Sequence, residues 1–126
     1  MGDSFRYKDW FNKAQKDLES AKILFKYNGD NAIISFHCQQ SIEKAMKGFI
    51  LARKSELIEG HSLIYLCKIS SNLDPSIKSF LKECAYVNQF YIETRYPADI
   101  PLSIEADEAE ECISIAEKIL QYLTNK

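Results

Sequence analysis

The stretch FHCQQSIEKAMK, residues 36–47, places several side chains that could do chemistry on one expected helix. Gln40, Glu43 and Lys47 follow one another at intervals of three and four residues, so they line one helix face. We call these three residues the polar seam. Glu43 and Lys47 also stand in the favourable order for an i,i+4 ion pair. Three interpretations stay open: a solvated helix face whose salt bridge contributes only about 0.3 to 0.5 kcal/mol, the wall of a groove that faces a ligand or partner, or the contact surface of a dimer.

The chain has two histidines, and each has a structural and a chemical interpretation. His37 lies at the boundary of the apolar stripe of its helix, where a histidine ordinarily finds one hydrogen-bond partner. His61 follows Gly60 at an expected helix start, which favours a capping or hinge role. It is a candidate acid/base group only if another titratable group converges on it.

A third group of candidates lies in the stretch YIETRYP, residues 91–97. Arg95 stands at a helix end, where a guanidinium can pair in a bidentate manner with a carboxylate or a phosphate. It could equally interact with the last carbonyl groups of the helix. Tyr91 precedes Arg95 by one turn, and Tyr96 could stack on a base or pack within the fold. The spacing leaves a binding corner and a structural corner equally open.

Helical periodicity of apolar residues places these candidates on a series of helices. The first helix begins at Tyr7 and is stopped by YNGDN, residues 27–31, where Asn28-Gly29 suits a left-handed cap and Asp30 or Asn31 can cap the next helix. The second helix runs from about Ala32 to Arg53. It is apolar nearly all round apart from the polar seam, so we expect it at the centre of a bundle.

The second half of the chain predicts three more helices. Residues 61–72 form a short one after a linker at 55–60. Asp74 caps the next, Pro75 takes its first position, and it ends near Thr94 because Pro97 disfavours helical geometry in the preceding residue. The last begins between Ser103 and Ala106 with an acidic first turn and a half. We predict an all-α, up-and-down bundle of four long helices and one short helix, formed as a single domain by residues 1–126.

Composition narrows the classes of function. The chain has 126 residues, 46% hydrophobic and 27% charged, and a net charge of -2. This balance disfavours a dedicated double-stranded DNA binder but is compatible with a nucleotide or a short RNA at a local patch. No apolar run approaches the ~18 residues of a membrane span, and the N-terminal residues lack the apolar core of a signal peptide. We therefore expect no membrane association and a cytoplasmic location.

Cysteines and known motifs predict neither a metal site nor a cofactor. The four cysteines each fall beside the apolar stripe of a different expected helix, and no C-x-x-C pair occurs, which favours four reduced core thiols over zinc ligands. The chain also lacks a P-loop, a G-x-G-x-x-G motif, an H-E-x-x-H motif and a Ser/His/Asp context. The cysteines are Cys38, Cys67, Cys84 and Cys112.

Taken together, these stretches resemble the HEPN family, the helical domains named for nucleotide binding in higher eukaryotes and prokaryotes. The resemblance covers nearly the whole chain. Its most specific parts are the polar seam, His61-Ser62-Leu63 and Arg95-Tyr96-Pro97. The matching segments, in order, are AQKDLESAKILF, YNGDNAIISFHCQQSIEKAMKGFIL, GHSLIYL, YIETRYPAD and ADEAEECISIAEKIL.

The resemblance implies a helical bundle that forms a homodimer and acts with a separate minimal nucleotidyltransferase, in some cases as a toxin and antitoxin pair. Many members are metal-independent ribonucleases that use an arginine followed, after four to six residues, by a histidine. Here no histidine follows Arg95, and seven residues separate Arg53 from His61. The resemblance therefore implies a non-catalytic or weakly catalytic accessory domain in which Arg95, Tyr96 and Lys47 line a nucleotide-facing groove. The alternative is an RNA-cleaving toxin that combines Arg95 with His37 or His61.

Overall fold

The computed structural model describes residues 2–91 and 103–125, and this part of the chain contains helices and no strand. The predicted all-α bundle is confirmed. The described helices are α1 Tyr7–Lys26, α2 Asn31–Lys54, α3 Leu63–Leu73, the 3-10 helix η1 Pro75–Phe80, α4 Leu81–Asn88 and α6 Ala106–Thr124.

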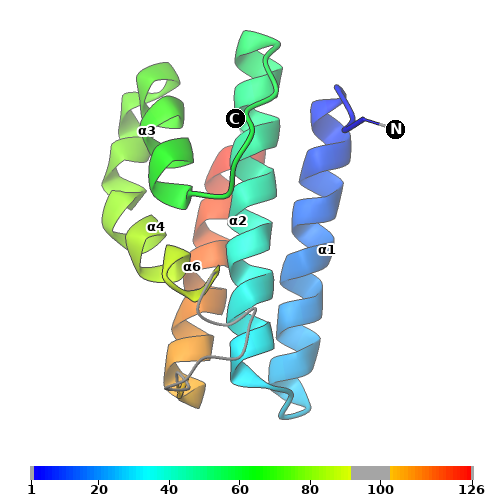
Figure 1. Cartoon of the computed structure of the whole chain (residues 1–126), viewed down its shortest axis with the longest axis vertical. Coiled ribbons are helices and arrows are strands. Elements are labelled where there is room, and N and C mark those ends of the chain that lie inside the picture. Colours follow the sequence, from blue (N-terminus) through cyan, green and yellow to red (C-terminus); the bar gives the residue numbers. More distant parts are fainter. Residues whose placement is uncertain (1, 92–102, 126) are drawn as a thin grey trace.

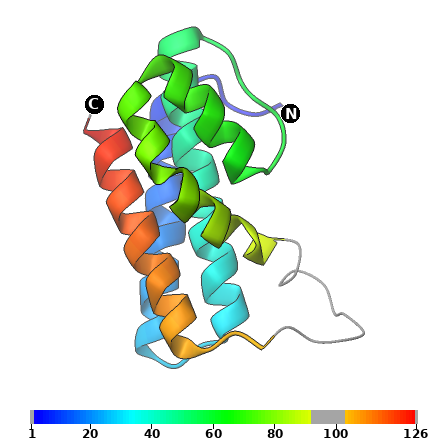
Figure 2. The same ribbon diagram turned by 90° about the vertical axis from the view of Figure 1, so that its left-hand side faces the viewer.

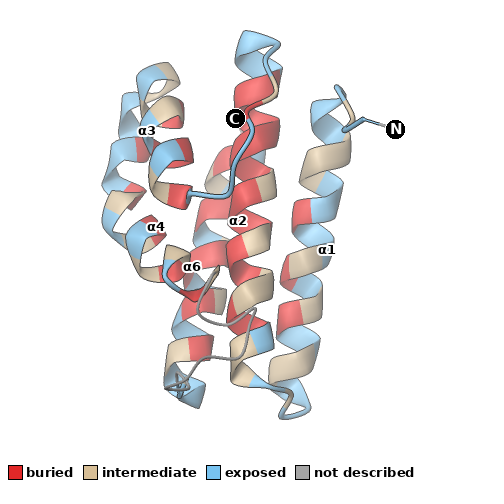
Figure 3. Ribbon diagram, viewed as in Figure 1, coloured by how far each residue is buried: buried red, intermediate tan, exposed pale blue. Residues whose placement is uncertain are grey.

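Helix α2 occupies the centre of the bundle, as predicted. It packs against α1, α3 and α6, and more lightly against α4. In Figure 1, α1 and α2 run antiparallel on one side, α3 and α4 lie on the other side, and α6 passes behind α2. Figure 2 shows α3 and α4 in front, with α6 and α2 beside each other behind them and α1 at the back. From Ser41 to Leu51 every residue except Lys44 is buried, which Figure 3 shows as a nearly continuous buried surface on α2.

The predicted start and stop residues act as their chemistry requires. The carboxylate of Asp30 accepts hydrogen bonds from the amides of Ala32 and Ile33 and so caps α2. Asn28, with φ of 59°, takes the left-handed conformation expected in the turn after α1. Ser62 caps α3, and Glu105 and Glu108 form a capping box at the start of α6.

The segment expected to form one helix from Pro75 differs in structure. Asp74 does cap it and Pro75 does begin it, but its first six residues form the 3-10 helix η1 before α4 takes over. A 3-10 helix places residues i and i+3 on one face, and Ile77 and Phe80 are both buried at that spacing. Helix α4 ends at Asn88. The expected helix end near Thr94 lies outside the described residues.

The core joins apolar side chains from every described helix, and the four cysteines belong to it. All four are free and buried, as predicted. Burial raises the pKa of Cys112 to about 12 and raises that of Cys38 further. A hydrogen bond from Cys84 lowers the pKa of Cys67 and raises the pKa of Cys84. None of the helices that the structure describes combines the length and apolar character needed to cross a membrane.

Candidate functional site

The carboxylate of Glu43 lies at the centre of a polar cluster inside the bundle. Its side chain is only 5% exposed and that of Lys47 is 8% exposed, with Lys47 Nζ 3.0 Å from Glu43 Oε2. The amide nitrogens of Gln39 and Gln40 reach Glu43 Oε1 at 3.4 Å and 3.2 Å. A buried charge is tolerated when it is paired and hydrogen-bonded, and Glu43 meets both conditions.

The burial of Glu43 and Lys47 excludes one of the three interpretations of the polar seam. A solvated helix face is excluded, because Glu43 and Lys47 are buried within one chain, while Gln40 is partly exposed. The pair lies where α2 faces α1 and the linker before α3, and the Lys47 ammonium stands 5.9 Å from the centre of the Trp10 ring on α1. Lys47 would have to break its ion pair with Glu43 to contact a ligand directly. In this arrangement its role is to neutralise and hold the Glu43 carboxylate.

His61 completes the cluster from the linker between α2 and α3. Its Nδ1 atom lies 3.0 Å from Oε2 and 3.1 Å from Oε1 of Glu43. An acid/base role of His61 requires a second titratable group close to it, and Glu43 is such a group. Because the carboxylate accepts the proton on Nδ1, the neutral imidazole keeps its lone pair on Nε2. The His61 side chain is 55% exposed, so a buried carboxylate orients an accessible imidazole.

The linker that carries His61 is held at two points. Gln39 Nε2 donates to the His61 carbonyl oxygen at 2.8 Å. Asn88, the last residue of α4, accepts a hydrogen bond from the Leu63 amide at 2.8 Å. His61 itself caps nothing, since Ser62 is the N-cap residue of α3. Hydrogen bonds from α2 and α4 therefore position the imidazole.

Aromatic rings form one wall of the cluster. The Tyr91 ring stacks on the His61 ring, with centroids 4.8 Å apart and planes 19° apart. Phe36 lies on α2 with its ring centre 5.9 Å from that of Tyr91. Stacking of this kind fixes the plane of the imidazole and presents flat surfaces beside it. We call Glu43, Lys47, His61 and Tyr91 the His61 site.

His37 belongs to a different cluster. Its Nδ1 atom lies 3.3 Å from Asp17 on α1, and Lys44 Nζ lies 2.7 Å from the other oxygen of the same carboxylate. Among the described residues, Asp17 is the one hydrogen-bond partner of His37, as expected of a boundary histidine. Its ring lies 6.2 Å from that of Phe36, but no described contact joins it to Glu43 or His61.

The structure thus brings Gln40, Glu43, Lys47, His61 and Tyr91 together and leaves His37 apart. Arg95 and Tyr96 lie outside the described residues, so their predicted roles stay predictions. No group of three His, Cys, Asp or Glu side chains within residues 2–91 and 103–125 could hold a metal ion.

Sequence reasoning did not assign Gln39 and Asn88 to the site, and it did not predict that Trp10 approaches Lys47. Gln39 carries a usable signal, because it lies one turn before Glu43 and would be expected to share its environment. Asn88 follows the buried Val87 at the end of a helix, which is a weak signal for a polar group that supports a backbone amide. Trp10 gives no such signal, since its approach to Lys47 depends on the packing of α1 on α2.

Comparison with known proteins agrees with this architecture. The family model for the HEPN domain matches residues 7–126. A protein of Methanocaldococcus jannaschii named "Putative toxin MJ1304" is 27% identical over 136 residues, which cover 97% of this chain and 89% of that protein.

Two solved structures share the fold over nearly their whole length. The crystal structure of TT1696 from Thermus thermophilus superposes with a TM-score of 0.81 at 29% identity, covering 97% of this chain and 98% of the other. The crystal structure of ST0689, described as an archaeal HEPN homologue, gives a TM-score of 0.75 at 26% identity, covering 95% and 96%. With the family model matching nearly every residue, the chain belongs to the HEPN domain family.

Proposed function

We propose that this chain is a nucleotide-binding accessory protein that acts, as a cytoplasmic homodimer, with a separate minimal nucleotidyltransferase in a toxin–antitoxin-like pair. The observation that carries the binding role is the His61 site, where a buried carboxylate orients an accessible imidazole against a stacked tyrosine ring. Membership of the HEPN family and the similarity to a protein named as a toxin support the same proposal.

The chemistry of the His61 site suits a phosphorylated nucleoside. His61 Nε2 can accept a hydrogen bond from a sugar hydroxyl, or donate one to a phosphate oxygen when the ring is protonated. The aromatic wall formed by Phe36 and Tyr91 suits the flat face of a base. Arg95 and Tyr96 would add a guanidinium for the phosphate and a second ring. Gln40, Glu43 and Lys47 hold the imidazole in place and close the inner side of the site.

Calorimetry with ATP and the other ribonucleoside triphosphates tests the binding role. The wild-type chain should bind at least one of them with a measurable heat. His61→Ala should weaken that binding by about tenfold or more, since it removes both the polar contact and the stacked ring. His37→Ala removes a histidine from the other cluster and is the matched control. Equal affinity in all three proteins, or no binding at all, would reject the site.

Co-expression tests the partner. The tagged chain is expressed with the product of the neighbouring gene, and the mass of the purified complex is measured by light scattering. A dimer that carries a nucleotidyltransferase supports the proposal. A lone monomer, with both proteins folded, contradicts it.

A second candidate function is metal-independent RNA cleavage, favoured by the Glu43–His61 pair. His61 would take the proton of a ribose 2′-hydroxyl, whose oxygen then attacks the adjacent phosphorus. The 5′-oxygen leaves with a proton from water, protonated His61 returns its proton to the solvent, and the products are a cyclic phosphate and a 5′-hydroxyl. Arg95 would stabilise the charge on the phosphate oxygens.

An RNA-cleavage assay tests this second function. Purified wild type, His61→Ala, Arg95→Ala and His37→Ala are incubated with RNA. This function is supported if wild type and His37→Ala cleave the RNA while His61→Ala and Arg95→Ala do not. Equal background cleavage by all four proteins rejects it.

A further inference from the structure

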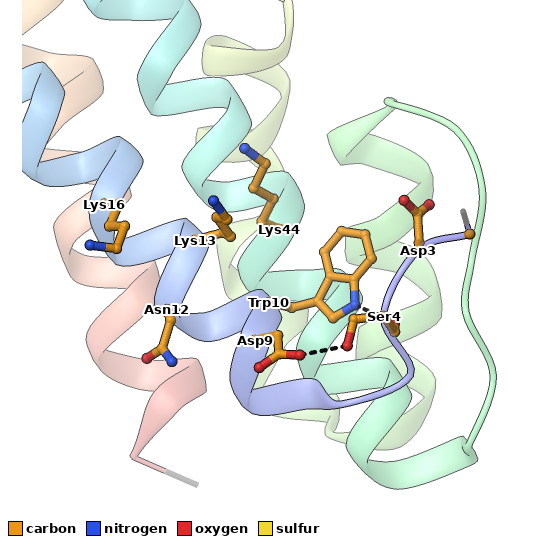
Figure 4. Close-up of a pocket in the computed structure, with 9 residues that line it drawn as sticks. Asp3, Ser4, Asp9, Trp10, Asn12, Lys13, Lys16 and Lys44 are labelled. Atoms are coloured by element: carbon orange, nitrogen blue, oxygen red, sulfur yellow. Dashed lines mark hydrogen bonds between the residues drawn. The ribbon is translucent and has the colours of Figure 1, made fainter.

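A separate groove lies between the N-terminal segment, α1 and α2, on the α1 side of the bundle. Its volume is about 690 Å³, which is within the range of small-molecule sites. Figure 4 shows the Trp10 ring in the middle of this groove, with Lys13 and Lys44 on one side and the segment that carries Asp3 and Ser4 on the other. We call it the Trp10 groove.

The Trp10 indole is held by its edge, and its ring lines the groove while Lys47 approaches the ring centre at 5.9 Å. Its Nε1–H donates to the Ser4 carbonyl oxygen at 2.8 Å. The Ser4 hydroxyl donates to Asp9 at 2.7 Å, which folds the N-terminal segment onto the first turn of α1. The indole is only half-buried. These hydrogen bonds keep an aromatic surface in a fixed position at the groove wall.

Three lysines and two carboxylates line the groove. They are Lys13, Lys16 and Lys44, with Asp3 and Asp9. Lys44 is paired with Asp17 at 2.7 Å. Lys13 and Lys16 are exposed and have no ion pair or hydrogen bond with any described residue.

The groove carboxylates of Asp3 and Asp9 form no ion pair with Lys13 or Lys16 among the described residues. Asp9 accepts from Ser4, and Arg6 approaches it at 3.8 Å. Two ammonium groups thus stay without acidic partners among the described residues, in a hollow that also holds a fixed aromatic face. This combination suits an anion whose charge is spread over several phosphate oxygens and which carries a flat ring.

We infer that the Trp10 groove binds a ligand with linked phosphates, which contact Lys13 and Lys16, while the ring of that ligand rests against Trp10. This site is distinct from the His61 site, because none of Glu43, Lys47, His61 and Tyr91 lines the groove, although Lys47 stands 5.9 Å from the centre of the Trp10 ring. The inference does not depend on the proposed function, and either can fail alone.

Fluorescence of Trp10 offers a direct test, since it is the only tryptophan in the chain. ATP and pyrophosphate are titrated into the protein while tryptophan alone is excited. Both should cause a saturable change, and ATP should bind more tightly because pyrophosphate has no ring. The Lys13→Ala/Lys16→Ala double variant should bind both at least about tenfold more weakly, and Lys13→Arg/Lys16→Arg should restore binding.

A matched control makes the outcome decisive. Lys78→Ala/Lys82→Ala removes the same charge from exposed positions on η1 and α4 and should bind as wild type does. No saturable change in wild type, or equal loss in the two double alanine variants, would overturn the inference. A response that disappears in His61→Ala but persists in Lys13→Ala/Lys16→Ala would overturn it as well, and would assign the ligand to the His61 site.

Discussion

The Nδ1 atom of His61 lies 3.0 Å from Oε2 of Glu43, which joins a half-exposed imidazole on a linker to a carboxylate inside the central helix. The contact links residues 18 positions apart and depends on Gln39 and Asn88, which hold the linker from α2 and α4. The imidazole is therefore a positioned group whose Nδ1 atom is held by Glu43, while no hydrogen bond from the described residues reaches its Nε2 atom.

Nuclear magnetic resonance of nitrogen-labelled histidine should find neutral His61 with its proton on Nδ1. The Glu43 carboxylate selects this tautomer, although free histidine side chains favour the proton on Nε2. In Glu43→Leu/Lys47→Met, which removes the carboxylate without leaving a buried charge, the Nε2–H form should predominate. His37, which contacts Asp17, should not change and serves as the internal reference. A wild-type His61 protonated on Nε2 would contradict the assigned geometry.

Glu43→Gln should lower the free energy of unfolding by about 3 kcal/mol or more, because it leaves the Lys47 ammonium without a counter-charge in a buried position. Glu43→Gln/Lys47→Met should recover most of that loss, since the second change removes the uncompensated charge. Urea denaturation measures both.

The matched control is the exposed pair of Lys54 and Glu56, which are 43% and 56% exposed and 3.6 Å apart. Glu56→Gln should change the free energy of unfolding by less than about 1 kcal/mol. Equal effects of Glu43→Gln and Glu56→Gln would show that burial of the seam is not maintained in solution.

Gly48→Ala should destabilise the packing of α1 on α2. A Cβ atom at this position would stand 2.9 Å from the Phe11 ring and 3.0 Å from Trp10 Cβ. We expect a loss of about 1 to 2 kcal/mol in thermal or urea unfolding, after allowing for the better helix propensity of alanine. Phe11→Leu should relieve part of this cost in the double variant. Gly2→Ala, where a Cβ meets nothing within 4 Å, is the control. A stability gain in Gly48→Ala would refute the close approach.

Alkaline pH should weaken the fold through its buried thiols. Burial raises the pKa of Cys112 from its ordinary 9.0 to about 12, so the unfolded chain releases this proton first. The corresponding stability is complete below pH 9 and is lost progressively as the pH rises from there towards 12, at a slope that approaches about 1.4 kcal/mol per pH unit. Urea denaturation at several pH values above 9 should give a shallower slope for Cys112→Ala than for wild type. Parallel slopes would contradict the prediction.

Much of the fold follows from local signals that need no tertiary information. Apolar periodicity places the helices, and Asp30, Asp74 and Pro75 mark helix starts through backbone chemistry that acts within a few residues. The central position of α2 follows from its nearly continuous apolar surface. The break between η1 and α4 does not follow from the sequence, because a single periodic stripe fits both a 3-10 turn and an α-helical turn over so few residues.

The sequence by itself determined which polar residues share a helix face, because 3.6 residues per turn bring Gln40, Glu43 and Lys47 into line wherever that helix packs. Only the tertiary structure decided that this line is buried, that His61 closes on Glu43, and that His37 turns instead to Asp17 on α1. The physical reason is that these contacts depend on how separate helices and a linker pack. Helical spacing carries no information about which distant side chain reaches a given carboxylate.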